Sequence, residues 1–172
     1  MKIVVASDSH GRPDILENIE KWEPDADLYL HCGDLCDEPF YYPNWLFVRG
    51  NNDYYADKRV MPNERVLSLE GHKLYMTHSH RCSYSNRKTD LVRLAKENNC
   101  DIVLYGHTHV GDDTKKAGIE LINPGSCWMN RDGKPASYVV MDLEQGKPPV
   151  IEFKYESEWP GHKRKSFFSR FA

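Results

Sequence analysis

Short apolar segments alternate with polar clusters along the chain, and their spacing predicts both strands and helices. Residues 2–7 form a short run rich in β-branched side chains, which is typical of a buried strand. Pro13 then begins a segment in which Ile15, Ile19 and Trp22 share one helical face. We therefore expect a strand followed by a helix with one buried side.

The rest of the chain repeats these two patterns. We expect strands at residues 27–31, 45–49, 101–105, 118–122, 137–143 and 150–155, a hairpin formed by 65–70 and 73–77, and a helix at 86–99. Buried runs early in the chain and closely spaced strands late in it favour a layered domain that mixes strands with helices. The expected fold class is therefore α/β (α+β).

The last fourteen residues differ in composition from those before them. Residues 159–172 combine basic side chains such as Lys163 and Arg164 with Phe167 and Phe168. We expect residues 1–158 to form one domain, followed by this basic and aromatic tail. The tail could be an amphipathic docking segment or a poorly ordered end, and the second interpretation is favoured.

Composition limits the classes of partner. A chain of 172 residues, with 40% hydrophobic and 28% charged residues, fits one globular domain. The net charge of −3 gives no overall attraction to nucleic acid or to an anionic membrane, so no specific nucleic-acid partner is expected. No apolar run approaches the roughly 18 residues of a membrane span, and the first residues carry no apolar signal-peptide core.

Cysteine usage indicates a reducing compartment. The sequence has five cysteines, an odd number, and contains no Cys-x-x-Cys pair. Neither a disulfide framework nor a zinc knuckle is therefore expected. The expected location is the cytoplasm.

Several of the apolar runs end directly in polar side chains that can bind metal. In chain order these side chains are Asp8, His10, Asp34, Asn51, His78, His107 and His109. Because ligands bind at the carboxyl ends of strands in layered α/β folds, we expect these side chains to meet at one rim. Carboxylate, imidazole and amide ligands suit divalent zinc, manganese, iron or nickel. The set exceeds the needs of one four-coordinate ion and suits two ions that share a bridging carboxylate.

The candidate ligands stand in a recognisable series of motifs. The series is Asp8-x-His10, Gly33-Asp34, Gly50-Asn51-x-Asp53, His78, Gly106-His107-x-His109 and the turn Asn123-Pro124-Gly125-Ser126. Together these motifs resemble those of the calcineurin-like metallophosphoesterases, and among them the small bacterial and archaeal phosphodiesterases. The resemblance implies two packed mixed β-sheets flanked by helices. It also implies hydrolysis of small phosphodiester substrates by a hydroxide that bridges two metal ions.

The same resemblance implies a role for each candidate ligand. Asp8, His10 and His109 would hold the first metal ion, Asn51, His78 and His107 the second, and Asp34 would bridge the pair. Manganese is the metal expected first, and iron, nickel and zinc also suit the ligands. No general acid or base is assigned, and the oligomeric state is left open.

Two positions depart from the family pattern. Asn52 stands where many relatives carry a histidine that can protonate the leaving group, and an amide is a poor proton donor. We therefore expect a preference for activated leaving groups, with His80 as the alternative donor. Ser79 stands where this branch usually has glycine.

Two other functions remain open at this point. One is a non-catalytic metal-binding scaffold of the same fold, as in a retromer subunit with incomplete ligands. The other is a phosphomonoesterase or nucleotide hydrolase. Every candidate position here carries a competent ligand, which favours the enzyme, and Asn52 argues against monoesters with poor leaving groups.

Other polar and aromatic residues are expected to have structural roles. His31, His72 and His162 are interpreted as hydrogen-bonded structural residues, and Cys32 as a small buried side chain. Asp53 is about equally consistent with a partner to a metal ligand and with capping or surface solvation. The aromatic residues of segment 39–45, with Tyr54 and Tyr55, are expected to pack over the core rather than form a stacking wall for a substrate.

Overall fold

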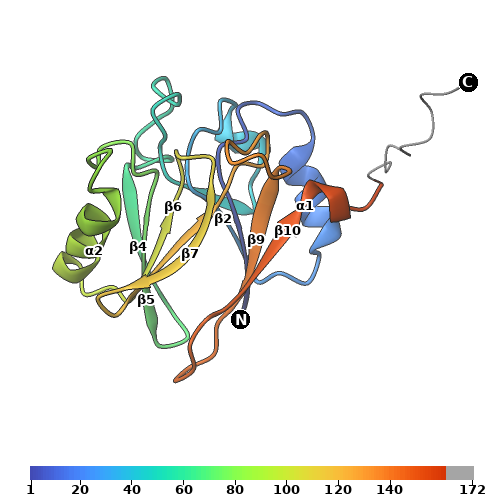
Figure 1. Ribbon diagram of the computed structural model, residues 1–172. Helices are drawn as coiled ribbons and strands as arrows, with labels where there is room; N and C mark the ends of the chain where they lie inside the picture. The colour runs from blue at the N-terminus through green and yellow to red at the C-terminus, as the bar shows by residue number, and fades with distance from the viewer. Residues whose placement is uncertain (162–172) are drawn as a thin grey trace, which may run out of the picture.

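The computed structural model describes residues 1–161, and there two five-stranded sheets pack together with one helix on each outer face (Figure 1). The strand orders are β10-β9-β1-β2-β3 and β4-β5-β6-β8-β7. The strands are β1 (Lys2–Ala6), β2 (Leu28–His31), β3 (Trp45–Phe47), β4 (Glu64–Leu69), β5 (His72–Thr77), β6 (Ile102–Tyr105), β7 (Gly111–Lys116), β8 (Ile119–Pro124), β9 (Ser137–Asp142) and β10 (Val150–Tyr155). The helices are α1 (Ile15–Trp22) and α2 (Arg87–Glu97), with 3₁₀ turns η1 (Pro39–Tyr41) and η2 (Glu156–Glu158). Neither helix of this described part is long and apolar enough to cross a membrane.

The alternation of side chains along the strands produces the layers. In β1, Ile3 and Val5 point into the space between the sheets, where they pack with Leu74 and Ile102 of the second sheet. Val4 points the other way and packs with the apolar face of α1. The outer face of the second sheet packs with α2 in the same manner. Both faces of the central strands are therefore buried, whereas the edge strands β4, β7 and β10 are partly exposed.

The central strands of each sheet are parallel, which brings their carboxyl ends to one rim. In the first sheet β1, β2 and β3 are parallel, with Ile3 opposite Leu28. In the second sheet β5, β6 and β8 are parallel, with Leu74 opposite Ile102. The carboxyl ends lie along the top of the molecule in Figure 1, whereas the β4–β5 and β9–β10 turns lie at the bottom.

This architecture confirms the expected fold class of two mixed sheets flanked by helices. The sequence pattern misses one strand, β7, whose side chains are mostly polar. β7 lies at the edge of its sheet beside β8, and its residues are partly or fully exposed, so no apolar alternation marks it. β8 continues to Pro124, two residues beyond the expected end.

Trp159, the first residue of the predicted tail, packs on the body of the protein. Its ring lies against Trp22 and Tyr138, and the Arg12 guanidinium is 5.3 Å from its centre. The tail from His162 onward lies outside the described residues, as do both interpretations of its role. The boundary at residue 158 therefore stays a prediction.

The aromatic residues between β2 and β4 are only partly packed. Trp45 is buried in the core, with 4% of its surface exposed. Phe40 and Tyr41 of turn η1 are 70% and 58% exposed, and their tilted rings contact each other with centres 4.1 Å apart. Tyr54 and Tyr55 are exposed as well. The expectation that this group covers the core is therefore wrong for these four side chains.

Candidate metal centre

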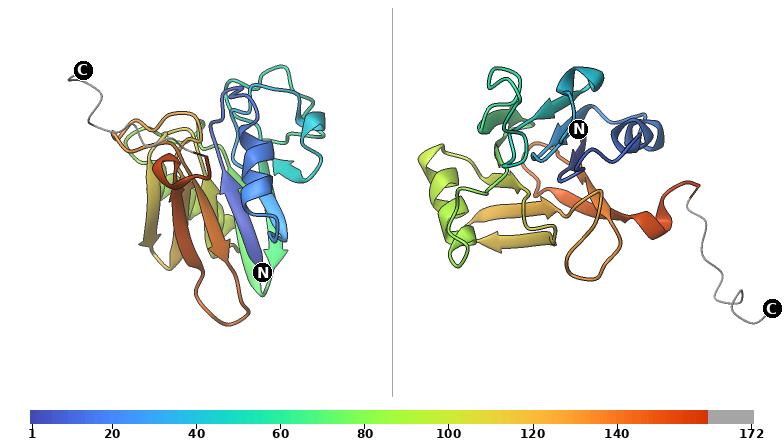
Figure 2. Two further views of the ribbon diagram at one scale, coloured as in Figure 1. Left: turned by 90° about the vertical axis from the view of Figure 1, so that its right-hand side faces the viewer. Right: turned by 90° about the horizontal axis from the view of Figure 1, so that it is seen from above.

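The candidate ligands lie in the loops that follow β1, β2, β3, β5 and β6, and these loops gather at one end of the molecule (Figure 2). Several ligands have a left-handed backbone: Asp8 (φ 54°), His10 (48°), Asp34 (56°), His107 (74°) and His109 (57°). This conformation costs about 1–3 kcal/mol in a residue other than glycine and clusters at functional sites. Backbone strain is thus concentrated where the candidate ligands meet.

Asp8, His10 and His109 form one group that could hold a metal ion. The Nε2 atoms of His10 and His109 lie 3.1 Å apart. Asp8 Oδ1 lies 3.2 Å from His109 Nε2 and 3.9 Å from His10 Nε2. Three ligand atoms thus converge on one point, the arrangement that a divalent cation requires.

Asp8, Asp34 and His78 form a second such group, which shares Asp8 with the first. His78 Nε2 is 3.4 Å from Asp34 Oδ2 and 3.9 Å from Asp8 Oδ1. Asp34 Oδ2 also lies 3.7 Å from His10 Nε2, so both carboxylates lie between the two sets of imidazoles. This geometry suits two neighbouring cations with shared carboxylate ligands.

Two buried polar atoms at the centre of the cluster lack hydrogen-bond partners among residues 1–161. They are Asp8 Oδ1 and His78 Nε2, and both residues are completely buried. Leaving a buried polar atom unpaired costs about 1–3 kcal/mol, and more when the group is charged. A cation placed between them would satisfy both atoms, so the ligand set fits a metal ion.

Backbone carbonyls orient two of the imidazoles. His78 Nδ1 donates a hydrogen bond to the Cys32 carbonyl at 2.7 Å, and His109 Nδ1 donates to the Met129 carbonyl at 3.0 Å. In the neutral form of each ring, protonation of Nδ1 leaves the lone pair on Nε2, which points into the cluster. Such hydrogen bonds fix both the tautomer and the direction of a metal ligand.

The charges of the cluster also suit cation binding. Burial alone would raise the pKa of Asp8 and of Asp34, but the histidines that face them hold both carboxyl pKa values below their ordinary range. Burial lowers the pKa of His10, and it lowers the pKa of His107 to about 4. Burial acts on His78 too, yet Asp34 and Asp8 outweigh it and raise the His78 pKa. The carboxylates are therefore ionised near neutral pH, with His10 and His107 neutral, as metal binding requires.

The other two candidate ligands lie at the open side of the cluster. The His107 ring is centred 5.2 Å from that of His78, and His107 is half-buried. Asn51 is exposed, and its side chain makes no hydrogen bond to a described residue. The structure thus brings His107 to the cluster but shows no contact of Asn51 with it.

Asn52 contacts the bridging candidate directly. Its backbone N–H and its Nδ2 donate to the two carboxylate oxygens of Asp34, at 2.8 Å and 2.6 Å. These bonds fix the orientation of the Asp34 carboxylate. His80 lies nearby, with its ring centre 5.5 Å from that of His78. Its role as the alternative proton donor stays a prediction.

The backbone of Ser79 explains why glycine is common at that position. Ser79 has φ 70°, which glycine adopts without strain. Its hydroxyl donates to the Gly106 carbonyl at 3.2 Å and accepts a hydrogen bond from Arg87 Nη1 at 2.8 Å. The side chain therefore links the two loops that carry His78 and His107.

Asp53 contacts the backbone of the loops that carry the candidate ligands. Its carboxylate is 1% exposed and accepts hydrogen bonds from the backbone N–H groups of Asp34 (2.7 Å), Gly50 (2.9 Å) and Cys36 (2.9 Å). Surface solvation of Asp53 is therefore excluded, and its carboxylate caps backbone N–H groups of the loops that carry Asp34 and Asn51. Asp53 holds the loops after β2 and β3 together.

Replacing Asp53 with Asn should destabilise the protein and weaken metal binding. Asn presents an N–H group to one of the three backbone donors, so the free energy of unfolding should fall by about 2 kcal/mol. Metal affinity should fall by about tenfold, because a residue that supports the ligands is lost. Thermal melting and metal titration would measure both. Asp57→Asn, on an exposed carboxylate of the same loop, is the control and should change neither.

Three polar residues of the site were not predicted from the sequence as partners of the ligands. Ser7 Oγ donates to Asp8 Oδ2 at 2.5 Å, and Ser126 Oγ donates to the Asp8 carbonyl at 2.8 Å. Asn123 Nδ2 donates to the Gly106 carbonyl and to Thr108 Oγ1. The Asn-Pro-Gly-Ser turn is a sequence signal for Asn123 and Ser126, whereas Ser7 belongs to no motif.

The histidines interpreted as structural are hydrogen-bonded where the structure describes them. His31 is buried, accepts a hydrogen bond from the Gly33 N–H, and pairs with Ser9 Oγ at 3.1 Å. Burial lowers the His31 pKa to about 4, so the ring is neutral. His72 lies away from the cluster and pairs with Asp101. Cys32 is completely buried, as expected.

A layered fold whose rim carries carboxylates and imidazoles suited to two cations defines the class of metal-dependent phosphoesterases. The chain belongs to the calcineurin-like phosphoesterase superfamily, whose domain it matches over residues 1–146. The family resemblance of the motifs is thereby confirmed. Divalent metal ions are implied by this membership.

Individual relatives support the same family. The chain is 32% identical over 154 residues to the probable metallophosphoesterase YsnB of Bacillus subtilis, covering 87% of this chain and 89% of that one. It is 35% identical over 103 residues to the phosphodiesterase YfcE of Escherichia coli, covering 56% of this chain and 52% of that one. A solved structure from Streptococcus pneumoniae, described as a predicted phosphoesterase, superimposes with a TM-score of 0.81 at 28% identity, covering 90% of this chain and 88% of that one.

Proposed function

We propose that the protein is a phosphodiesterase that uses two divalent metal ions, preferably manganese, to hydrolyse small phosphodiesters. The observation that carries the proposal is the pair of completely buried, unpartnered atoms, Asp8 Oδ1 and His78 Nε2, which face each other at 3.9 Å. The naming of a relative, YfcE, as a phosphodiesterase supports the choice of diester over monoester.

The two groups of side chains supply five of the proposed ligands, and the resemblance of the motifs adds Asn51 and His107. Asp8, His10 and His109 would hold one ion, and Asn51, His78 and His107 the other, with Asp34 shared. When bound, the two ions would lower the pKa of a bound water and place positive charge near the phosphate oxygens. The chain supplies ionised carboxylates, neutral His10 and His107, and ring orientations fixed by backbone carbonyls.

The leaving group is the part of the reaction for which the chain offers least help. The Asn52 side-chain amide already donates a hydrogen bond to Asp34, and an amide does not release a proton near neutral pH. The enzyme should therefore prefer substrates with activated leaving groups, such as nitrophenolate. His80 is the side chain that we propose as donor for less activated substrates.

A reducing, cytoplasmic setting fits the cysteines. All five cysteines lie in the described part of the chain and are free. Burial raises the pKa of the Cys127 thiol to about 12, which keeps this thiol protonated and unreactive.

The proposal is tested by a metal-resolved activity screen. The protein is stripped with a chelator, supplied with manganese, iron, nickel or zinc, and assayed on aryl diesters, cyclic nucleotides, monoesters and pyrophosphates. Hydrolysis of an aryl diester only after metal is restored is the expected result. Metal binding without hydrolysis of any phosphate ester would instead favour a non-catalytic scaffold, and a monoester preference would favour a phosphomonoesterase.

A further inference from the structure

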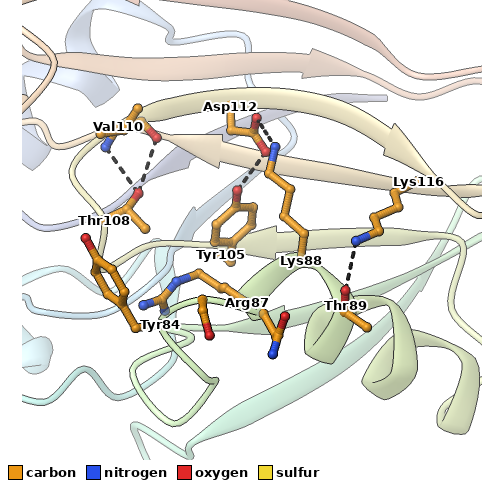
Figure 3. Close-up of a pocket in the computed structure, with 11 residues that line it drawn as sticks. Tyr84, Arg87, Lys88, Thr89, Tyr105, Thr108, Val110, Asp112 and Lys116 are labelled. Carbon is orange, nitrogen blue, oxygen red and sulfur yellow. Dashed lines mark hydrogen bonds and ion pairs between the residues drawn. The ribbon is translucent and has the colours of Figure 1, made fainter.

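A cavity of about 480 Å³ lies between the amino-terminal end of α2 and strand β7 (Figure 3). Tyr84 and Arg87 line it from the α2 side, and Tyr105 and Lys116 line it from the sheet. Its volume is within the range of cavities that bind small ligands. None of the candidate metal ligands lines it, so it is separate from the metal centre.

The cavity nevertheless begins beside the metal centre. Thr108, which lines it, is the residue between the candidate ligands His107 and His109. Arg87 donates to the backbone carbonyl and the hydroxyl of Ser79, the residue after His78. Residues next to two candidate ligands thus contribute to the wall of the cavity or contact a side chain that does, so the cavity and the metal centre are neighbours.

The charge of the cavity is positive, although the chain as a whole carries −3. Of its cations, Lys88 is neutralised by Asp112, whose carboxylate lies 2.7 Å from Lys88 Nζ and also accepts the Tyr105 hydroxyl. Arg87 and Lys116 have no carboxylate partner among residues 1–161. Lys116 Nζ donates only to Thr89 Oγ1, at 2.9 Å, and Figure 3 shows both cations among the lining side chains.

Arg87 is suited to an anionic ligand by its remaining donors. Its contacts with described residues use Nη1 alone, which leaves Nε and Nη2 without a partner in this part of the chain. A guanidinium with two free N–H groups can bind a phosphate or carboxylate through two parallel hydrogen bonds. Lys116 would add a second, non-directional positive charge.

We propose that this cavity binds a second anionic group of the substrate, at a distance from the phosphodiester that is cleaved. The inference rests on the proposed function and adds a substrate class: phosphodiesters that carry a further phosphate or carboxylate. Arg87 donates hydrogen bonds to that group, and Lys116, which lines another part of the same cavity, adds positive charge that favours it.

A matched pair of substrates tests the proposal. Thymidine 5′-(4-nitrophenyl phosphate) and its 3′-phosphorylated form share the diester and the leaving group and differ by one phosphate. The wild-type enzyme should show a KM about tenfold lower for the 3′-phosphorylated form, since charge-assisted hydrogen bonds are strong. This preference should shrink in Lys116→Gln and in Arg87→Gln. Lys115→Gln, on the opposite side of β7 and not lining the cavity, is the control and should keep it.

Binding without turnover separates failure of this inference from failure of the proposed function. Calorimetry would compare thymidine 3′,5′-bisphosphate with thymidine 5′-monophosphate in the metal-loaded wild type and in the two variants. Tighter binding of the bisphosphate, reduced in Lys116→Gln and in Arg87→Gln, supports the cavity even if no substrate is hydrolysed. Equal affinities and equal KM values in the wild type, or a preference that survives in both variants, would overturn it.

Discussion

Replacing Asp34 with Ala is expected to abolish turnover of an aryl phosphodiester. Asp34 Oδ2 lies 3.4 Å from His78 Nε2 and 3.7 Å from His10 Nε2, so the carboxylate lies between both sets of imidazoles. Its loss removes the carboxylate that the two proposed metal ions share. The rate should fall by about 10³-fold or more, which corresponds to about 4 kcal/mol of transition-state stabilisation.

The comparison variant is Asp37→Ala, on the same loop. Asp37 accepts hydrogen bonds from the Glu38 N–H and the Tyr42 hydroxyl and lies outside the ligand groups. Steady-state assays with saturating manganese, together with circular dichroism, would show whether Asp34→Ala is folded but inactive. Wild-type activity in Asp34→Ala would refute the assignment of this residue, and a similar loss in Asp37→Ala would attribute the effect to the loop.

Gly50→Ala should disrupt the same site by steric means alone. A Cβ atom at Gly50 would lie 2.0 Å from Asp34 Oδ1 and 2.2 Å from the Asp34 backbone nitrogen. Because the nearest atoms include backbone, the loop after β2 must move to admit a methyl group. We expect a loss of about 3 kcal/mol in the free energy of unfolding, hence a melting temperature lower by about 6–12 °C, and a loss of activity with it.

A glycine elsewhere separates this clash from general effects of substitution. Gly133 has φ 80° and no atom within 4 Å of an added Cβ, so Gly133→Ala tests backbone strain without a steric clash. It should cost about 1 kcal/mol and leave activity unchanged. A Gly50→Ala protein as stable and active as Gly133→Ala would show that Asp34 tolerates displacement.

The sequence was sufficient to predict that most of the candidate ligands would gather at one rim. Each candidate ligand follows an apolar run, and the parallel pairing of those runs brings their carboxyl ends together. The run before Asp8, for example, pairs in parallel with the run before Asp34. Strand burial is a property of local composition, and so a single sequence reveals it.

The interactions that orient the ligands could not be predicted in this way. The Cys32 carbonyl that fixes His78 lies 46 positions away in the chain, and nothing in the local pattern pairs them. Asp53 illustrates the same limit, because its buried role depends on the close approach of two loops. The polar edge strand β7 and the cavity at Arg87 also went unpredicted, since polar residues on a sheet edge resemble loop residues.

Counting the metal ions bound per chain tests the central claim most directly. The stripped protein would be titrated with manganese and examined by calorimetry and by native mass spectrometry, with Asp34→Ala in parallel. Two ions per wild-type chain, and fewer in the variant, are predicted from the shared carboxylates of the site. One ion or none in the wild type, or two in Asp34→Ala, would contradict the two-metal site.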